Sequence, residues 1–124
     1  MQPQVLTTPY AEYKIENGIL IVTYANNLVI SLEIAKQLAA DRIRFSNSIT
    51  TPILIDIRGL ASVDTISRKF LADSSQYVSA GALLVESLIS KLAGNIFITV
   101  DKPSVPTRLF TDREKALRWL AKFK

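Results

Sequence analysis

Two aspartates and several hydroxyl side chains within residues 56–67 are the residues best suited to chemistry. Asp56 and Asp64 could share acid and base roles or hold a divalent cation, but no third ligand stands near them in the sequence. The chain has no histidine and no cysteine, which removes the commonest general base near neutral pH and all thiol chemistry. It also has no glycine-rich phosphate loop. We therefore expect a non-enzymatic protein with no metal and no cofactor.

The patterns on either side of these residues indicate where they lie. Residues 53–57 are apolar apart from Asp56, as in a central parallel strand that is covered on both faces. Gly59 indicates a turn, and residues 64–75 carry the helical spacing of Ile66, Phe70 and Leu71. Ligands and partners of open α/β sheets usually bind at the carboxyl ends of the strands. The sequence thus predicts a working surface over residues 59–67.

The remaining patterns predict strands that alternate with helices after a leading hairpin, for which Asn17-Gly18 is a strong signal. The predicted strands are 11–16, 19–24, 28–30, 53–57, 77–85 and 107–110, and the predicted helices are 31–45, 64–75, 86–100 and a last one opened by a capping box at Thr111–Glu114. This order predicts an α/β domain with a mixed, mostly parallel sheet of about five strands and four helices packed on it. We expect a flexible lead-in over residues 1–10 and a single domain over residues 11–124.

The positive charge is concentrated at one end of the chain. The net charge is +4, and residues 102–124 hold seven Lys or Arg against two acids. A basic tail could meet nucleic acid or an anionic membrane. We favour the simpler interpretation that Lys122 and Lys124 sit at a helix C-terminus, where the dipole favours cations, and expect no nucleic-acid partner. No apolar run reaches the ~18 residues of a membrane span and no signal peptide precedes the domain, so we expect a cytoplasmic protein without membrane insertion.

Residues 56–68 resemble, without a gap, the signature of the STAS domain found in sulfate transporters and anti-sigma-factor antagonists. That family reads roughly Asp-Leu-Ser-Gly-Val, three residues, then Ile-Asp-Ser-Ser/Thr-Gly-Leu. The matching residues are Asp56-Ile57-Arg58-Gly59-Leu60 and Val63-Asp64-Thr65-Ile66-Ser67-Arg68. The family's second hydroxyl is Ile66 here, and its glycine is Ser67. The resemblance extends over residues 11–123 and is greatest to the SpoIIAA-like branch, which shares its architecture with Sec14-type lipid carriers.

The resemblance implies a regulatory domain that acts through protein contacts and that is switched by phosphorylation of the hydroxyl after the aspartate, here Thr65. A phosphate at a helix N-terminus meets free N–H groups and a favourable dipole. The candidates for partner binding or for the switch are Asp64, Thr65, Ser67, Arg68, Ser62 and Asp56. The alternative is that Asp64 or Ser62 merely caps the helix and Thr65 is an ordinary first-turn residue.

Two other functions stay open at this point. The predicted helix over residues 86–100 is apolar on most of its circumference, so it must be buried in the core, in an interface or against a ligand. A homodimer through this helix or through the sheet edge is one expectation, and a carrier of a small apolar or lipid-like ligand held between the helix and the sheet is another. A hydrolase using Asp56 and Asp64 ranks last. Trp119 is expected to pack at the rim of the last helix.

Overall fold

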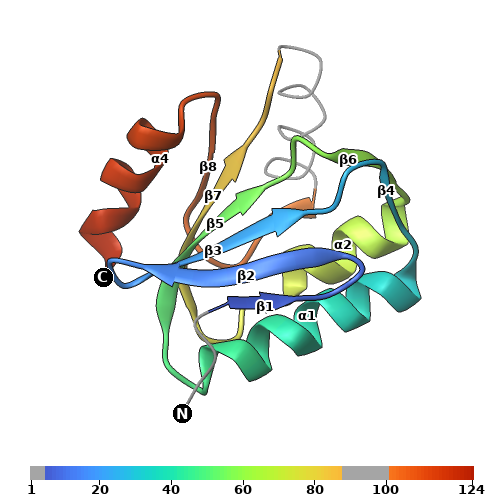
Figure 1. Ribbon diagram of the computed structural model, residues 1–124, viewed down its shortest axis with the longest axis horizontal. Coiled ribbons are helices and arrows are strands. Elements are labelled where there is room, and N and C mark those ends of the chain that lie inside the picture. The colour runs from blue at the N-terminus through green and yellow to red at the C-terminus, as the bar shows by residue number, and fades with distance from the viewer. Residues whose placement is uncertain (1–4, 88–100) are drawn as a thin grey trace.

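The computed structural model of the protein describes residues 5–87 and 101–124 and is built on a six-stranded sheet (Figure 1). The strand order is β1-β2-β3-β5-β7-β8. Pairing is antiparallel from β1 to β3 and parallel from β3 to β8. The strands are β1 (Val5–Thr7), β2 (Ala11–Glu16), β3 (Ile19–Tyr24), β5 (Thr51–Asp56), β7 (Val78–Leu84) and β8 (Thr107–Phe110). A separate pair of short parallel strands is formed by β4 (Leu28–Ile30) and β6 (Leu60–Val63).

Helices cover both faces of the sheet. The helices of the described residues are α1 (Leu32–Ser46), α2 (Thr65–Asp73) and α4 (Arg113–Leu120), and a 3-10 turn, η2 (Ala121–Phe123), follows α4. Figure 1 shows α1 and α2 on one side of the sheet and α4 on the other. The first side buries a core that includes Tyr13, Leu20, Leu38 and Ile53. The second buries Ile21, Leu54, Ala82 and Leu120, among others.

The leading hairpin forms as the sequence predicts. Asn17 and Gly18 connect β2 to β3 with positive φ angles of 50° and 78°. Two positive angles are what a tight hairpin turn requires, and asparagine and glycine tolerate them best. The register then places Glu16 opposite Ile19. The antiparallel part of the mixed sheet is therefore set by local turn chemistry.

The strand β5 lies between β3 and β7, so the predicted interior position of residues 53–57 is confirmed. Ile53 and Leu54 are buried on opposite faces of the sheet, at 4% and 0% exposure. The helix predicted from Ser31 is also confirmed as α1, because the Ser31 hydroxyl accepts a 3.3 Å hydrogen bond from the Ile34 N–H.

Several predicted elements need correction. The expected count of about five strands is wrong, because the described residues form eight strands in two sheets. Three of the four expected helices lie among the described residues, as α1, α2 and α4. Strand β1 lies within residues 1–10, which were expected to be a flexible lead-in. Its backbone pairs with β2. Strand β6 lies in the stretch read as a loop. The last helix is capped by Asp112 instead of Thr111, and the predicted helix over 86–100 falls almost wholly outside the described residues.

Candidate functional site

The candidate site lies where the chain leaves β5, forms β6 and enters α2. Figure 1 shows β4 and β6 side by side beyond the carboxyl ends of β3 and β5, next to the start of α2. Their register places Val29 opposite Ser62. All six residues predicted from the sequence belong to this region, but the structure gives them different surroundings.

Asp56 is used by the loop that follows it. Its carboxylate accepts two hydrogen bonds from the Arg58 guanidinium, at 2.9 and 2.8 Å, and one from the Arg58 backbone N–H at 3.1 Å. Partial burial raises the pKa of Asp56, but the bonds from Arg58 outweigh it and leave the pKa of Asp56 below its ordinary value. Asp56 therefore stabilises the loop as an ionised group, and both of its carboxylate oxygens are engaged by Arg58.

Gly59 brings the loop against the backbone that leaves β3. A Cβ atom on Gly59 would stand 2.8 Å from the Ala25 carbonyl oxygen and 3.1 Å from the Asn26 Cα. The Leu28 N–H also donates a 3.3 Å hydrogen bond to the Gly59 carbonyl. Glycine is thus required here by close approach of two backbones. This contact fixes β6 and the start of α2 relative to the sheet.

Asp64 is the N-cap of α2. Its carboxylate accepts a 2.7 Å hydrogen bond from the Ser67 backbone N–H, which holds the pKa of Asp64 below its ordinary value. Capping is the simpler of the two roles weighed for this residue, and the geometry accounts for it fully. The cap leaves Asp64 itself exposed and ionised at the surface.

The next two residues, Thr65 and Ile66, project from the first turn of α2. Both are exposed, and Ile66 reaches 69%. On the adjoining strands Val29 is 59% exposed and Ser62 is exposed too. We call these four residues, with Asp64, the α2-tip surface. No described segment of the chain covers it.

The outward position of Ile66 corrects the predicted inward stripe. The buried residues of α2 are Ser67 and Ala72, and the partly buried Leu71, four residues after Ser67, packs against the same side. Ile66 is one residue, or about 100°, away from Ser67 and so points outward. Sequence reasoning missed Ile66 and Val29 as surface residues. The signal that could have found Val29 was the alternation of β4, whose Leu28 and Ile30 are buried.

Ser67 and Arg68, the other two predicted residues, face the interior. Ser67 is 0% exposed, and its Oγ has no hydrogen-bond partner among the residues that the structure describes. Arg68 Nε donates to Asp101 Oδ2 at 2.8 Å, and Asp101 is itself only 3% exposed. Lys69 Nζ donates to the Asp101 carbonyl at 3.2 Å. These contacts tie α2 to the chain that leads into β8 and remove Ser67 and Arg68 from the surface.

A metal site, a membrane span or a ligand-binding hollow would each require its own set of residues. Within residues 5–87 and 101–124 no three His, Cys, Asp or Glu side chains gather as metal ligands would. No helix in the same ranges is long and apolar enough to cross a bilayer. An open hollow at the ends of β1 and β3 and the start of β2 is lined by both polar and apolar residues, among them Thr7, Glu12, Tyr24 and Ala25. The apolar helix proposed to hold a lipid-like ligand lies outside the described residues, so that function stays a prediction.

Two solved structures share this architecture. One is an uncharacterized protein of the DUF3478 family with a SpoIIAA-like fold from Shewanella loihica, at 18% identity and a TM-score of 0.59, with 94% of this chain and 90% of that chain covered. The other is an anti-sigma factor antagonist from Mycobacterium paratuberculosis, at 14% identity and a TM-score of 0.65, with 94% and 99% covered. At these identities the likeness shows the fold, and it confirms the SpoIIAA-like fold expected from the STAS resemblance.

The comparisons at the level of sequence point to one family. No curated protein matches the chain. A family model described as "Domain of unknown function (DUF7793)" matches residues 13–124, which is nearly the whole domain from β2 to the C-terminus. The chain therefore belongs to the DUF7793 family.

Proposed function

We propose that this protein is a non-catalytic regulatory domain that binds a protein partner through the α2-tip surface and is switched by phosphorylation of Thr65. The observation that carries the proposal is the 69% exposure of Ile66 beside the exposed hydroxyl of Thr65. Val29, at 59% exposure, adds a second apolar side chain on the neighbouring strand. A structural neighbour that is an anti-sigma factor antagonist supports a regulatory role for the fold.

The surroundings of Thr65 favour a switch of the repulsive kind. Thr65 is the first residue of α2, where backbone N–H groups and the dipole favour a phosphate. The phosphate would add a charge of about −1.5 to −2 next to the ionised Asp64. Arg68, one turn later, is engaged by Asp101 and so does not neutralise this charge. Phosphorylation is therefore expected to expel an apolar or acidic partner from Ile66 and Val29.

The test is cross-linking of the protein to its partners in its native cells, followed by quantitative mass spectrometry. The variants are Ile66→Ser and Thr65→Glu, and the matched control is Ile49→Ser, because Ile49 is 60% exposed at the far end of α1. We expect a protein that is captured by the wild type and by Ile49→Ser and is depleted at least about fivefold in both other variants, a loss of about 1 kcal/mol. A second copy of this chain captured in the same pattern would assign the surface to a homodimer.

One result would remove the whole proposal, and another would remove only its switch. Equal capture of every partner by Ile66→Ser and by the wild type would show that the α2-tip surface binds nothing. Equal capture by Thr65→Glu, together with loss in Ile66→Ser, would keep the binding surface but remove Thr65 as its switch.

A further inference from the structure

The far edge of the sheet carries a second surface with its own chemistry. The carbonyls of Pro106, just before β8, and of Phe110, its last residue, accept 2.8 Å hydrogen bonds from the N–H groups of Gly81 in β7 and of Val85, the residue after β7. Along a strand, successive residues direct their N–H and C=O groups to opposite sides. The backbone groups of Thr107 and Leu109 therefore point away from β7, where no described strand pairs with them. An edge of this kind is a template for another strand.

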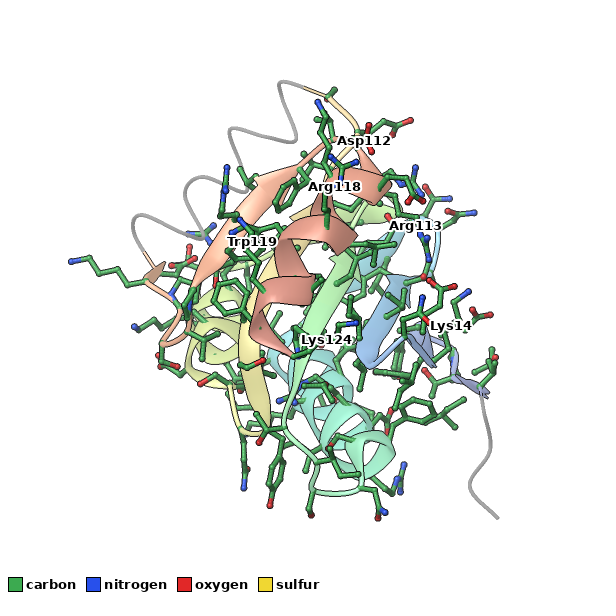
Figure 2. The ribbon with its side chains drawn as sticks, turned by 90° about the vertical axis from the view of Figure 1, so that its left-hand side faces the viewer. Lys14, Asp112, Arg113, Arg118, Trp119 and Lys124 are labelled. Carbon is green, nitrogen blue, oxygen red and sulfur yellow. The ribbon has the colours of Figure 1, made fainter. Side chains whose placement is uncertain are left out.

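Aromatic rings and an arginine join β8 to α4 on one face of this edge. The Arg108 guanidinium lies 5.4 Å from the centre of the Phe110 ring and 5.6 Å from that of Trp119. The Trp119 ring also contacts Phe110 and Phe123, at 5.8 and 4.9 Å between centres. Trp119 thus marks the side of α4 that faces β8, as Figure 2 shows. This confirms that Trp119 packs, and it directs the Trp119 side of α4 toward the edge strand β8.

Cations line the side of α4 next to Trp119. At about 100° per residue, Lys115 lies about 40° and Arg118 about 100° from Trp119 on the same side of α4, and Lys122 follows in η2. With Arg108 they form what we call the basic flank. In the part of the chain that the structure describes, none of the four has a carboxylate within ion-pair distance. The acids of α4, Asp112 and Glu114, are confined to its first turn.

We propose that the outer edge of β8 and the basic flank together bind an acidic, extended segment of a partner protein as an added strand. Only a peptide backbone can pair with the outward groups of Thr107 and Leu109. Such a strand would lie about 4.8 Å beyond β8. Its alternate side chains would then stand beside Arg108 and beneath Lys115 and Lys122, where charge complementarity selects Asp and Glu. Nucleic acid and lipid headgroups match the charge but have no partner for the strand edge.

A defined peptide tests the charge part of the proposal. The probe is a fluorescein-labelled peptide of four Glu-Thr repeats, and its binding to the full chain is followed by fluorescence anisotropy. We expect saturable binding that a Lys-Thr repeat does not show. The variant Lys115→Glu/Lys122→Glu should weaken it at least about fivefold, from the loss of two exposed charge contacts and their replacement by repulsion. The control Lys36→Glu/Lys102→Glu changes the net charge equally, through two exposed lysines outside the basic flank, and should bind the peptide like the wild type.

Two further measurements test the strand part. Two more peptides carry N-methyl groups, one on every Glu nitrogen and one on every Thr nitrogen, so that each blocks one edge of the added strand. One of the two should lose binding, and equal binding by both and by the parent peptide would overturn strand addition. Absence of saturable binding by the parent would overturn the whole proposal. A third outcome would also overturn it. In that outcome the peptide binds the wild type and Lys115→Glu/Lys122→Glu equally, whereas vesicles that contain phosphatidylserine bind only the wild type.

Discussion

The loop after β5 and the first turn of α2 are separated by only one short strand, yet they use their polar residues in different ways. In the loop, Asp56 is occupied by Arg58, and Gly59 packs against the backbone at Ala25. In the first turn of α2, Thr65 and Ile66 project from the surface. A polar residue at the end of a strand is thus available to a partner only where no local contact uses it. The loop therefore stabilises the fold, whereas the first turn of α2 exposes side chains that a partner can contact.

The largest effect should come from breaking the ion pair between Arg68 and Asp101, which ties α2 to the chain that leads into β8. Replacing Arg68 by Met leaves Asp101, whose side chain is 4% exposed, as a buried charge without its partner. We expect the free energy of unfolding to fall by about 3 kcal/mol, as when one partner of a buried pair is removed. The measurement is urea unfolding followed by circular dichroism. The control is Asp73→Asn, because the pair of Asp73 with Lys69 is exposed at both ends and should contribute at most about 0.5 kcal/mol.

The double variant Arg68→Met/Asp101→Leu completes this prediction. With both charges replaced by apolar side chains, most of the lost stability should return. A loss below about 1 kcal/mol in Arg68→Met alone would mean that Asp101 is hydrated, and that α2 is not anchored by this pair.

A smaller loss is expected from the close backbone contact in the loop. In Gly59→Ala the new methyl group would meet the Ala25 carbonyl at 2.8 Å, so the two backbones must separate. We expect a loss of about 1 to 3 kcal/mol in urea unfolding, the usual cost of overpacking. Gly81→Ala is the control, since its Cβ would have neighbours no nearer than 3.7 Å, and its stability should be unchanged or slightly raised. Equal stability of the two variants would show that the loop does not rest on residues 25 and 26.

The hairpin, the cap of α1 and strand β5 were easier to predict from the sequence than the segment that forms β6 and the first turn of α2. The hairpin at Asn17-Gly18, the cap at Ser31 and the interior strand β5 follow from local turn chemistry and from an unbroken apolar run, and the sequence carries both signals directly. Strand β6 could not be predicted, because its Leu60–Val63 backbone is strand only through pairing with β4, some 30 residues earlier in the chain. Long-range pairing of this kind leaves little trace in local composition.

The position of the candidate site was predicted correctly, but the exposure of its individual residues was not. The six residues do lie at the carboxyl end of β5, as the general rule for open α/β sheets suggested. Which of them are free depends on contacts that the sequence does not reveal, such as the pairing of Arg68 with Asp101 across 33 positions. A helical stripe shifted by one residue was enough to exchange the roles of Ile66 and Ser67. Rotation of a short helix is therefore the main source of error at such a site.

A still smaller effect, of opposite sign, is expected at Ser67. Its hydroxyl is buried without a hydrogen-bond partner in the described ranges 5–87 and 101–124, and such a group costs free energy in the folded state. Ser67→Ala removes that group and fits a helix better, so we expect the free energy of unfolding to rise by up to about 1 kcal/mol. The Asp64 cap is kept because it uses the Ser67 backbone N–H. A loss of stability in urea unfolding would indicate that the hydroxyl has a partner in solution.

The smallest effect separates the charge of Asp64 from its role as a cap. Because the folded pKa of Asp64 lies below its ordinary value of 3.8, its charge contributes stability above that pH, and the contribution disappears as the pH falls through the folded pKa. Asn caps a helix about as well as Asp but does not titrate, so Asp64→Asn keeps the hydrogen bond and loses the pH dependence. We therefore expect the wild type to be the more stable of the two near neutral pH, and the difference to shrink as the pH is lowered below 3.8. Asp56 titrates in both proteins, so its contribution cancels in this difference. Urea unfolding of both from about pH 6 to about pH 2 measures it. A difference that stays constant over this range would mean that Asp64 acts through geometry alone, and that the first turn of α2 does not depend on a fixed negative charge beside Thr65.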